Sequence, residues 1–277
     1  MKYRGRLAPS PTGLLHLGHA QTFWIAWKRA RAAGGSLILR NEDLDRARCR
    51  PEFVTAMLED LRWLGLDWDE GPYAQSERLE LYRAAFRKLK EGGFLYPCRC
   101  SRGDVLRALQ APHAADEEPI YPGTCRPSAG KPVVEGAPLN WRFRVPDGRE
   151  ITFLDGGFGK QTFVAGRDFG DFVVWRHDDA PSYQLAVVTD DAAMEITEVV
   201  RGADLLVSTA RQCLLYEALG WKQPAFFHAP LVTNENGVRL AKRDDAWSIR
   251  ARREQGMTPE NVRAEFKPPP EPGRLFS

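Results

Sequence analysis

The stretch RLAPSPTGLLHLGH, residues 6–19, decides how this chain is organised. A short strand is predicted over residues 4–8, a turn rich in Pro, Ser and Gly follows, and beyond it apolar residues recur at helical spacing. His16 and His19 therefore fall at the N-terminus of the predicted helix, with Gly18 between them. Both imidazoles can donate N–H groups to one phosphate there, and Gly18 lets a nucleotide approach closely. The stretch predicts a phosphate-binding loop between a strand and a helix; two solvent-facing histidines are the alternative.

The segments that follow continue an α/β pattern. Gly34 and Gly35 end the first helix, and residues 36–40 form an apolar run typical of a buried parallel strand, which completes a βαβ unit. Residues 96–136 lack apolar periodicity and are expected to form an insertion. Helices are predicted over 51–64, 77–91 and 208–219. Strands are predicted over 141–145, 151–154 and 171–175, and the turn-forming residues 146–148 lie between the first two of them. The segments 183–188 and 195–200 follow the third strand.

This pattern predicts an α/β fold with a Rossmann-type nucleotide-binding core and a parallel sheet, split by a small inserted domain. Ligands are expected at the carboxyl ends of the strands. Four parts are predicted: the first half of the core over 1–95, the insertion over 96–165, the second half of the core over 166–233, and a loop with a short C-terminal part over 234–277.

Composition excludes several classes of protein. The 277 residues are 43% hydrophobic and 27% charged, a globular balance, and the net charge of +2 is far from that of a strongly basic nucleic-acid-binding protein. No apolar run of about 18 residues exists, so a transmembrane helix is not expected. The N-terminus lacks the apolar run of a secretory leader, and we expect a cytoplasmic protein.

The five cysteines are unevenly spaced. Cys98, Cys100 and Cys125 cluster within the insertion, whereas Cys49 and Cys213 stand apart, a distribution that does not suit a disulfide framework. Three thiolates favour tetrahedral zinc, which needs a fourth ligand. His113 and Tyr121 are the two candidates, and three ordinary thiols are the alternative to a metal site.

Several motifs together resemble one family. RLAPSPTG leading into HLGH is similar to the HIGH signature of class I aminoacyl-tRNA synthetases, in the form found in glutamyl-tRNA synthetases. LRNEDLD at 39–45 and VVRGAD at 199–204 resemble two further segments of that family, and LAKR at 240–243 stands where its KMSKS loop belongs. The matches run in the family's order over about residues 4–245, which is more specific than any one motif.

The resemblance implies roles for individual residues. It implies that Arg6, Ser10 and the intervening Leu7, Ala8 and Pro9 hold glutamate, with Glu42 on its ammonium group and Tyr183 and Arg201 completing the pocket. Two guanidiniums and one carboxylate complement the charges of glutamate. It implies that His16, Gly18, His19 and Lys242 bind ATP, whose phosphates carry Mg²⁺, and that His16, His19 and Lys242 stabilise the charge that develops during adenylate formation. A structural ion pair is the alternative for Glu42 and Arg201.

The loop around Lys242 departs from the KMSKS pattern. Arg239 replaces the first lysine and Arg243 the last serine, so one lysine remains for the triphosphate. A mobile loop with these cations can still neutralise departing pyrophosphate. A surface Lys-Arg pair is the alternative.

The resemblance also favours one branch of the family. Tyr121 and Cys125 match the Tyr-x-x-x-Cys element of the glutamyl-Q tRNA(Asp) synthetases, which favours Tyr121 as the fourth zinc ligand. Only 35 residues follow Lys242, too few for the anticodon-binding domains of a glutamyl-tRNA synthetase. The resemblance therefore implies activation of glutamate without tRNA and its transfer to the queuosine base in the anticodon of tRNA(Asp). The alternatives are a truncated glutamyl-tRNA synthetase acting on a tRNA 3′ end and a non-catalytic RNA-binding paralogue.

Overall fold

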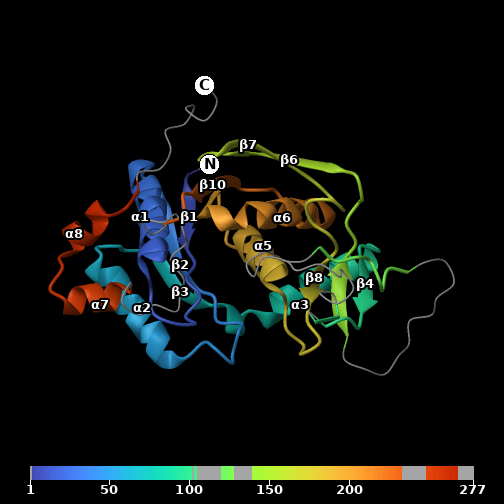
Figure 1. Ribbon diagram of the computed structural model, residues 1–277, viewed down its shortest axis with the longest axis horizontal. Helices are drawn as coiled ribbons and strands as arrows, with labels where there is room; N and C mark the ends of the chain where they lie inside the picture. The colour runs from blue at the N-terminus through green and yellow to red at the C-terminus, as the bar shows by residue number, and fades with distance from the viewer. Residues whose placement is uncertain (1, 102, 105–119, 128–138, 233–247, 268–277) are drawn as a thin grey trace.

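The predicted βαβ unit opens the fold. The computed structural model describes residues 2–101, 103–104, 120–127, 139–232 and 248–267 (Figure 1). Strand β1 (Arg4–Leu7) leads into helix α1 (Leu17–Ala32) and returns in β2 (Ser36–Asn41), parallel to β1. The sequence prediction of strand, loop, helix and strand is confirmed over this region. β3 (Glu70–Ala74) adds a third parallel strand, which the sequence did not predict because Gly71 and Pro72 interrupt its apolar pattern.

A second sheet lies against the first. Its strand order is β7 (Gly159–Val164), β6 (Glu150–Asp155), β10 (Ala225–Ala229) and β9 (Glu198–Gly202), with β9, β10 and β6 parallel. The Thr197 amide donates to the Arg4 carbonyl at 2.9 Å, which joins the start of β9 to β1. The carboxyl ends of β1, β2, β9 and β10 therefore gather at one edge.

A third, antiparallel sheet stands apart from that edge, at the right of Figure 1, with the order β4 (Leu95–Cys98), β5 (Asn140–Phe143) and β8 (Phe172–Trp175). The strands predicted on either side of residues 146–148 are present, and the Arg149 amide closes a turn on the Pro146 carbonyl at 3.0 Å. They do not pair with each other, because β5 joins β4 and β8 whereas β6 joins β7 and β10. The turn therefore passes the chain from one sheet to the next.

The helices pack on these sheets and complete two apolar cores. One core gathers around Phe143, Phe169 and Leu215, and the other around Leu7, Leu39 and Leu61. The helices are α2 (Pro51–Trp63), α3 (Leu79–Glu91), α5 (Tyr183–Ala193), α6 (Leu206–Leu219), α7 (Ile249–Glu254) and α8 (Pro259–Ala264), with 3-10 turns η1 (Gln75–Glu77) and η2 (Ala203–Leu205). α6 ends where Gly220 takes a φ of 66°, as the sequence predicted.

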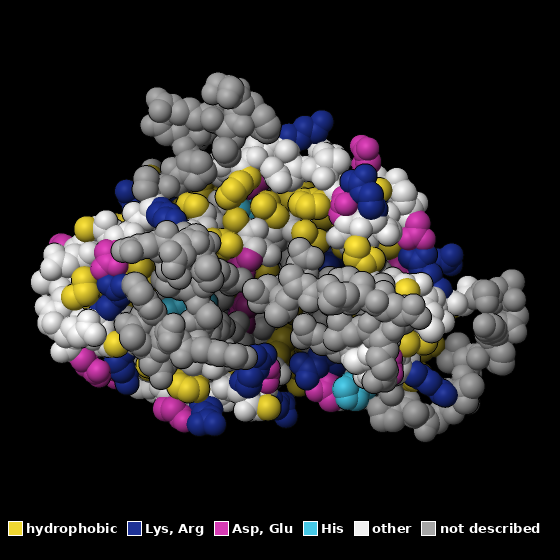
Figure 2. Space-filling view, in the orientation of Figure 1, with side chains coloured by type: hydrophobic (Ala, Val, Ile, Leu, Met, Phe, Trp, Pro, Cys, Tyr) yellow, Lys and Arg dark blue, Asp and Glu magenta, His cyan; other side chains and the backbone are white. Residues whose placement is uncertain are grey.

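The surface agrees with the near-neutral net charge. On the face seen in Figure 2, Lys and Arg side chains alternate with Asp and Glu side chains around the visible edge, and neither sign forms a continuous field. Among the described residues, no helix is long and apolar enough to span a bilayer.

Candidate active site and metal centre

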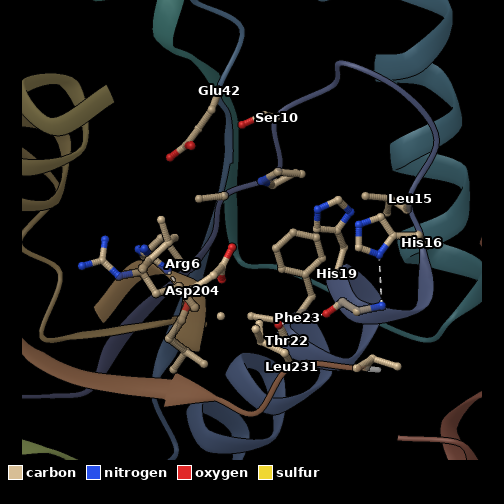
Figure 3. Close-up of a pocket in the computed structure, with 18 of the residues that line it drawn as sticks. Arg6, Ser10, Leu15, His16, His19, Thr22, Phe23, Glu42, Asp204 and Leu231 are labelled. Atoms are coloured by element: carbon tan, nitrogen blue, oxygen red, sulfur yellow. Dashed lines mark hydrogen bonds between the residues drawn. The ribbon is translucent and has the colours of Figure 1, made fainter. Parts of the chain in front are cut away.

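A cavity of about 310 Å³ opens where the parallel strands end. Figure 3 shows His16 and His19 side by side at one end, with Ser10 and Glu42 at another. Ligand pockets of α/β folds form at this edge because the loops that leave adjacent strands converge there. The cavity brings together most of the residues predicted for glutamate and ATP: Arg6, Ala8, Pro9, Ser10, His16, Gly18, His19, Glu42, Tyr183 and Arg201.

Leu7 is the exception among the predicted glutamate residues. Its side chain is fully buried in the core formed with Leu39 and Leu61, and it does not line the cavity. Neighbouring residues of a strand point to opposite faces, so the strand that directs Arg6 toward the cavity directs Leu7 away from it. We therefore correct the contact predicted for Leu7 to a packing role.

His16 begins α1 and caps it. Its Nδ1 accepts a hydrogen bond from the Gly18 amide at 3.2 Å, so the proton of the neutral ring resides on Nε2. The ring stacks on His19 with the centroids 3.7 Å apart. A Cβ on Gly18 would lie 3.2 Å from His16 Cε1, tighter than an ordinary contact. Gly18 thus leaves room for the capping ring as well as for a nucleotide.

The floor of the cavity is a buried ion network. The Arg40 guanidinium, with no exposed surface, donates to Asp191 at 2.7 Å and to Glu42 Oε1 at 2.9 Å. Arg6 donates to the Val200 carbonyl at 2.8 Å and lies 3.4 Å from Asp191. The ion pair that we gave as the alternative for Glu42 is therefore present, and the same carboxylate also lines the cavity.

Burial and ion pairing shift the pKa values of the buried carboxyl groups in opposite directions. Burial alone would raise the pKa of Asp191, but Arg40 and Arg6 hold it below its ordinary value. Burial raises the pKa of Glu42 above its ordinary value, although Arg40 and Arg6 offset part of the effect. An ammonium group beside Glu42 would favour the carboxylate, so ligand binding and ionisation of Glu42 support each other.

Arg201 enters the cavity from β9 and is held by residues that the sequence analysis did not single out. Nε donates to His228 Nε2 at 3.2 Å, and Nη2 donates to Thr209 Oγ1 at 2.6 Å. Nη1 is buried and has no hydrogen-bond partner among the described residues. Because a buried guanidinium nitrogen without a hydrogen-bond acceptor is costly, this atom favours the binding of an anionic ligand.

Other lining residues were also missed. Thr22 and Phe23 follow from the helical register of α1, since they lie one turn beyond Gly18 and His19. Asp204 belongs to the VVRGAD segment, which the sequence analysis quoted without assigning this residue a role. Val200 and Gly202 flank Arg201 in β9 and belong to the same VVRGAD segment. The remaining lining residues were not singled out by any sequence motif: Leu15, Leu205, Pro230, Leu231 and Val232.

Lys242, Arg239 and Arg243 lie outside the described residues, as does His113. Ser248, just after the loop segment, forms a bridge with His16, and the Ile249 amide donates to the Leu15 carbonyl at 2.8 Å. Ser248 and Ile249, which follow the segment that contains Lys242, therefore lie at the histidine end of the cavity.

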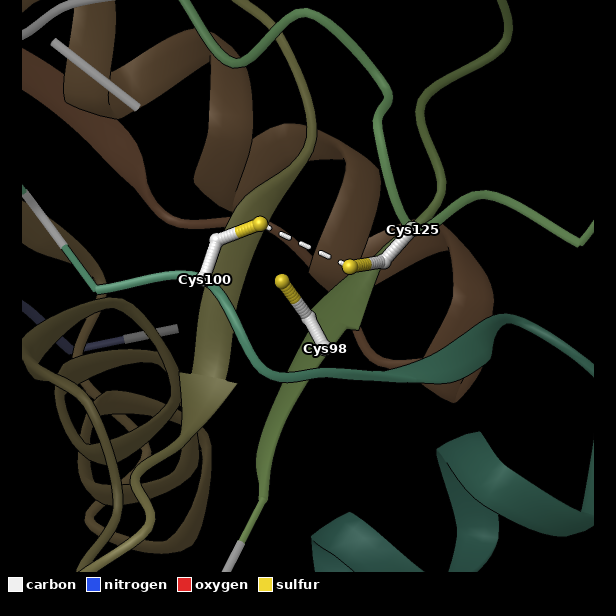
Figure 4. Close-up of side chains that lie close together, drawn as sticks. All are labelled: Cys98, Cys100 and Cys125. Atoms are coloured by element: carbon white, nitrogen blue, oxygen red, sulfur yellow. Dashed lines mark hydrogen bonds between the residues drawn. The ribbon is translucent and has the colours of Figure 1, made fainter. Parts of the chain in front are cut away.

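The three clustered cysteines meet beside the antiparallel sheet (Figure 4). The Sγ atoms of Cys98, Cys100 and Cys125 all lie within 4.8 Å of one another, and those of Cys100 and Cys125 are 3.5 Å apart. The edge of a ZnS₄ tetrahedron with bonds of about 2.3 Å is about 3.8 Å. The cysteines can hold a metal ion, and their soft donor set suits zinc.

Tyr121 places an oxygen beside these sulfurs. Its Oη lies 3.4 Å from Cys98 Sγ and 3.6 Å from Cys100 Sγ, and it accepts from the Cys125 amide at 2.7 Å. The Arg142 guanidinium donates to Cys98 Sγ at 3.1 Å and covers the Tyr121 ring at 3.9 Å. The positive charge of Arg142 therefore lies next to the sulfur atoms, which would be negatively charged as thiolate ligands.

The segment that carries Tyr121 and Cys125 is fixed from outside the cluster. Arg126 pairs with Asp171 at the start of β8, and Nη2 lies 2.6 Å from Asp171 Oδ1. Gly170 lies so close that a Cβ there would be 2.9 Å from the Tyr121 backbone. The geometry of the donor set is thus imposed by the antiparallel sheet.

Comparisons with known proteins relate this chain to one family. Residues 2–266 match the family model of the catalytic domain of class I tRNA synthetases (E and Q). A glutamyl-Q tRNA(Asp) synthetase of Symbiobacterium thermophilum is 51% identical over 93% of this chain and 83% of its own length. A glutamate–tRNA ligase of Aquifex aeolicus is 41% identical over 100% of this chain and 60% of its own.

A solved structure of a glutamate tRNA ligase has a similar fold. The crystal structure of a glutamate tRNA ligase from Elizabethkingia meningosepticum, in complex with its amino acid, superposes with a TM-score of 0.76 and 32% identity. The match covers 88% of this chain and 52% of that one.

Proposed function

The chain belongs to the class I tRNA synthetases (E and Q), among the glutamyl-Q tRNA(Asp) synthetases, and from this premise we propose that it activates L-glutamate with ATP and transfers it to tRNA. The observation that carries the proposal is one cavity with a charge set for glutamate and stacked histidines at the N-terminus of α1. Binding of glutamate and of ATP phosphates in the same cavity is the minimum that adenylate formation requires.

The glutamate end supplies complementary charges. The Arg201 Nη1 atom is buried and has no hydrogen-bond partner in the described part of the chain, and Arg6 lines the same cavity, so two guanidiniums would meet the two carboxylates of glutamate. Glu42 would receive the ammonium group. Arg40 and Asp191 fix Glu42 and Arg6 from below, so these groups are in place before the substrate arrives.

The histidine end would bind the phosphates. One carboxylate oxygen of glutamate attacks the α-phosphorus of ATP, the bond to the bridging oxygen breaks, and pyrophosphate leaves. The Nε2–H group of His16, the stacked His19 and the positive end of the α1 dipole would stabilise the charge on the α-phosphate. Mg²⁺ bound to ATP, with Lys242, Arg239 and Arg243, would neutralise the departing pyrophosphate.

The acceptor is proposed to be the queuosine base in the anticodon of tRNA(Asp). A nucleophile on the base attacks the activated carbonyl, the mixed anhydride bond breaks, and AMP leaves. Support comes from relatives named glutamyl-Q tRNA(Asp) synthetase, which reach 51% identity, against 41% for the Aquifex aeolicus glutamate–tRNA ligase. Such a reaction belongs in the cytoplasm, which stays our prediction for this chain.

The cysteine cluster is proposed to be a structural zinc site with Cys98, Cys100, Tyr121 and Cys125 as ligands. Zinc would supply cross-linking in a small subdomain that has little apolar core of its own. The division of the chain into four parts also stays a proposal.

Isotope exchange between pyrophosphate and ATP tests the first step. The wild-type protein should catalyse exchange that depends on glutamate and Mg²⁺ and needs no RNA. Exchange that appears only when tRNA(Glu) is added would instead identify a truncated glutamyl-tRNA synthetase. Absence of exchange under both conditions would support a non-catalytic RNA-binding protein.

A further inference from the structure

A chain of buried hydrogen bonds connects Arg201 to two neighbouring strands of the sheet formed by β7, β6, β10 and β9. Asp155 ends β6, His228 lies within β10, and Arg201 lies within β9, and their side chains are at most 4% exposed. His228 Nδ1 lies 2.6 Å from Asp155 Oδ2, and His228 Nε2 lies 3.2 Å from Arg201 Nε. Neither Asp155 nor His228 lines the cavity.

The direction of each hydrogen bond in this chain is fixed. Arg201 Nε always carries a proton, so His228 Nε2 accepts and the imidazole proton resides on Nδ1, which donates to Asp155. Asp155 also accepts from the amides of Gly157 at 2.9 Å and Phe158 at 2.8 Å, which hold the carboxylate in place. Burial lowers the pKa of His228, in keeping with a neutral ring beside a guanidinium.

Thr209 completes the support of Arg201. Its Oγ1 accepts from Arg201 Nη2 at 2.6 Å, and its hydroxyl proton faces two acceptors, the Leu205 carbonyl at 3.1 Å and His228 Nε2 at 3.0 Å. Nε and Nη2 of the guanidinium are therefore bound by the protein, and Nη1 is left buried at the cavity with no hydrogen-bond partner among the residues that the structure describes. A guanidinium held in this way loses little freedom when a carboxylate binds.

We propose that His228, held by Asp155, is a positioning residue that orients Arg201 so that Nη1 binds a carboxylate of the amino acid substrate. This inference rests on the proposed function. It assigns the neutral imidazole the role of an acceptor for Nε, and it predicts that the loss of this acceptor weakens glutamate binding rather than the chemical step.

Two substitutions separate the acceptor from the rest of the ring. In His228→Gln the amide oxygen can reach the position of Nε2 and still accept from Arg201. In His228→Asn the shorter amide can donate to Asp155, but nothing reaches Arg201. Both variants remove the same ring from the core, and they differ from each other in packing by one methylene group. Tyr3→Phe is the control, because it removes a 2.8 Å hydrogen bond to Glu198 in the same sheet, away from the cavity.

Steady-state pyrophosphate exchange at varied glutamate and varied ATP gives the readout. We expect His228→Asn to raise the KM for glutamate about 10- to 100-fold, the usual cost of a lost hydrogen bond to a charged group. Its kcat and its KM for ATP should stay within about threefold of wild type, and His228→Gln should keep the glutamate KM within about threefold. Tyr3→Phe should match the wild type in all three parameters.

A wild-type glutamate KM in folded His228→Asn, or an equal rise in both His228 variants, would overturn the positioning role. Should His228→Asn fail to fold, Thr209→Val removes the acceptor of Nη2 instead, and an unchanged glutamate KM there would also overturn it. These outcomes presuppose glutamate-dependent exchange by the wild type. Absence of that exchange would contradict the proposed function itself, and the positioning role would fall with it.

Discussion

The Arg40 guanidinium donates to Glu42 Oε1 at 2.9 Å without any exposure to solvent, so a cavity-lining carboxylate is anchored by a cation that no ligand reaches. Arg40 also pairs with Asp191 at 2.7 Å and lies 3.7 Å from Asp190. One buried cation thus compensates several buried carboxylates and shapes the floor of the site.

Replacing Arg40 should therefore be costly for folding. Arg40→Met keeps much of the volume but removes the cation that these buried carboxylates share, which leaves only the weaker support of Arg6 for Asp191 and of Arg78 for Asp190, and we expect the free energy of unfolding to fall by about 3–5 kcal/mol. Urea denaturation measures the change. Arg149→Met, which breaks an exposed pair with Glu217, is the control and should cost less than about 1 kcal/mol. Equal losses in the two variants would refute the role of Arg40.

Asp60 gives the stability of the protein a pH dependence. Its carboxylate oxygens are buried and accept no hydrogen bond from the described residues, and burial raises its pKa to about 6 from 3.8 despite Arg250 and Arg253. The folded state then holds this proton more tightly than the unfolded state, so stability contributed by Asp60 is lost as the pH rises from about 4 to about 6.

Asp60→Asn should remove this dependence. Relative to wild type, the variant should gain up to about 3 kcal/mol in the free energy of unfolding between pH 4 and pH 7. Urea denaturation at both pH values tests this expectation. A difference between variant and wild type that does not change with pH would contradict it.

Gly18 offers a test of the His16 geometry. In Gly18→Ala the new methyl group would press on the His16 ring, and we expect kcat for pyrophosphate exchange to fall about tenfold, because small displacements of catalytic groups are costly. The KM for glutamate should not change. Gly13→Ala is the matched control in the same loop, since a Cβ there meets no atom within 4 Å. Equal activity of the two variants would rule out the proposed role of the ring.

The metal centre is tested by metal analysis of the purified protein. We expect about one zinc ion per chain in the wild type, almost none in Cys98→Ser and a reduced content in Tyr121→Phe. Cys49→Ser is the control, because its thiol lies outside the cluster. Full zinc occupancy in Tyr121→Phe after dialysis against a chelator would exclude the tyrosine as a ligand.

The sequence correctly predicted those strands and helices whose apolar pattern and turn residues lie within one short segment. The strand at residues 4–8, the helix that follows the Pro- and Gly-rich turn and the strand after Gly35 were predicted correctly because apolar spacing and turn residues act over a few positions. Longer-range pairing was not predictable in this way. The strands on either side of the turn at residues 146–148 belong to different sheets, and that choice depends on partners far along the chain.

The same distinction holds for the site. Arg6, Glu42 and Arg201 were found through a resemblance carried by local motifs. His228 lies within the apolar strand AFFHA, where one histidine gives no functional signal, and only sheet pairing brings it between Asp155 and Arg201. Leu7 was assigned to the cavity by its place in a motif, whereas strand alternation buries it.

Transfer of labelled glutamate to tRNA(Asp) tests the central claim most directly. The protein, ATP, Mg²⁺ and labelled glutamate are incubated with tRNA(Asp) that contains queuosine or lacks it, and the label is located after nuclease digestion. We predict label on the queuosine nucleoside of the anticodon and none on tRNA(Asp) without queuosine. Label at the 3′ terminal nucleoside, or equal labelling of both tRNAs, would contradict the account.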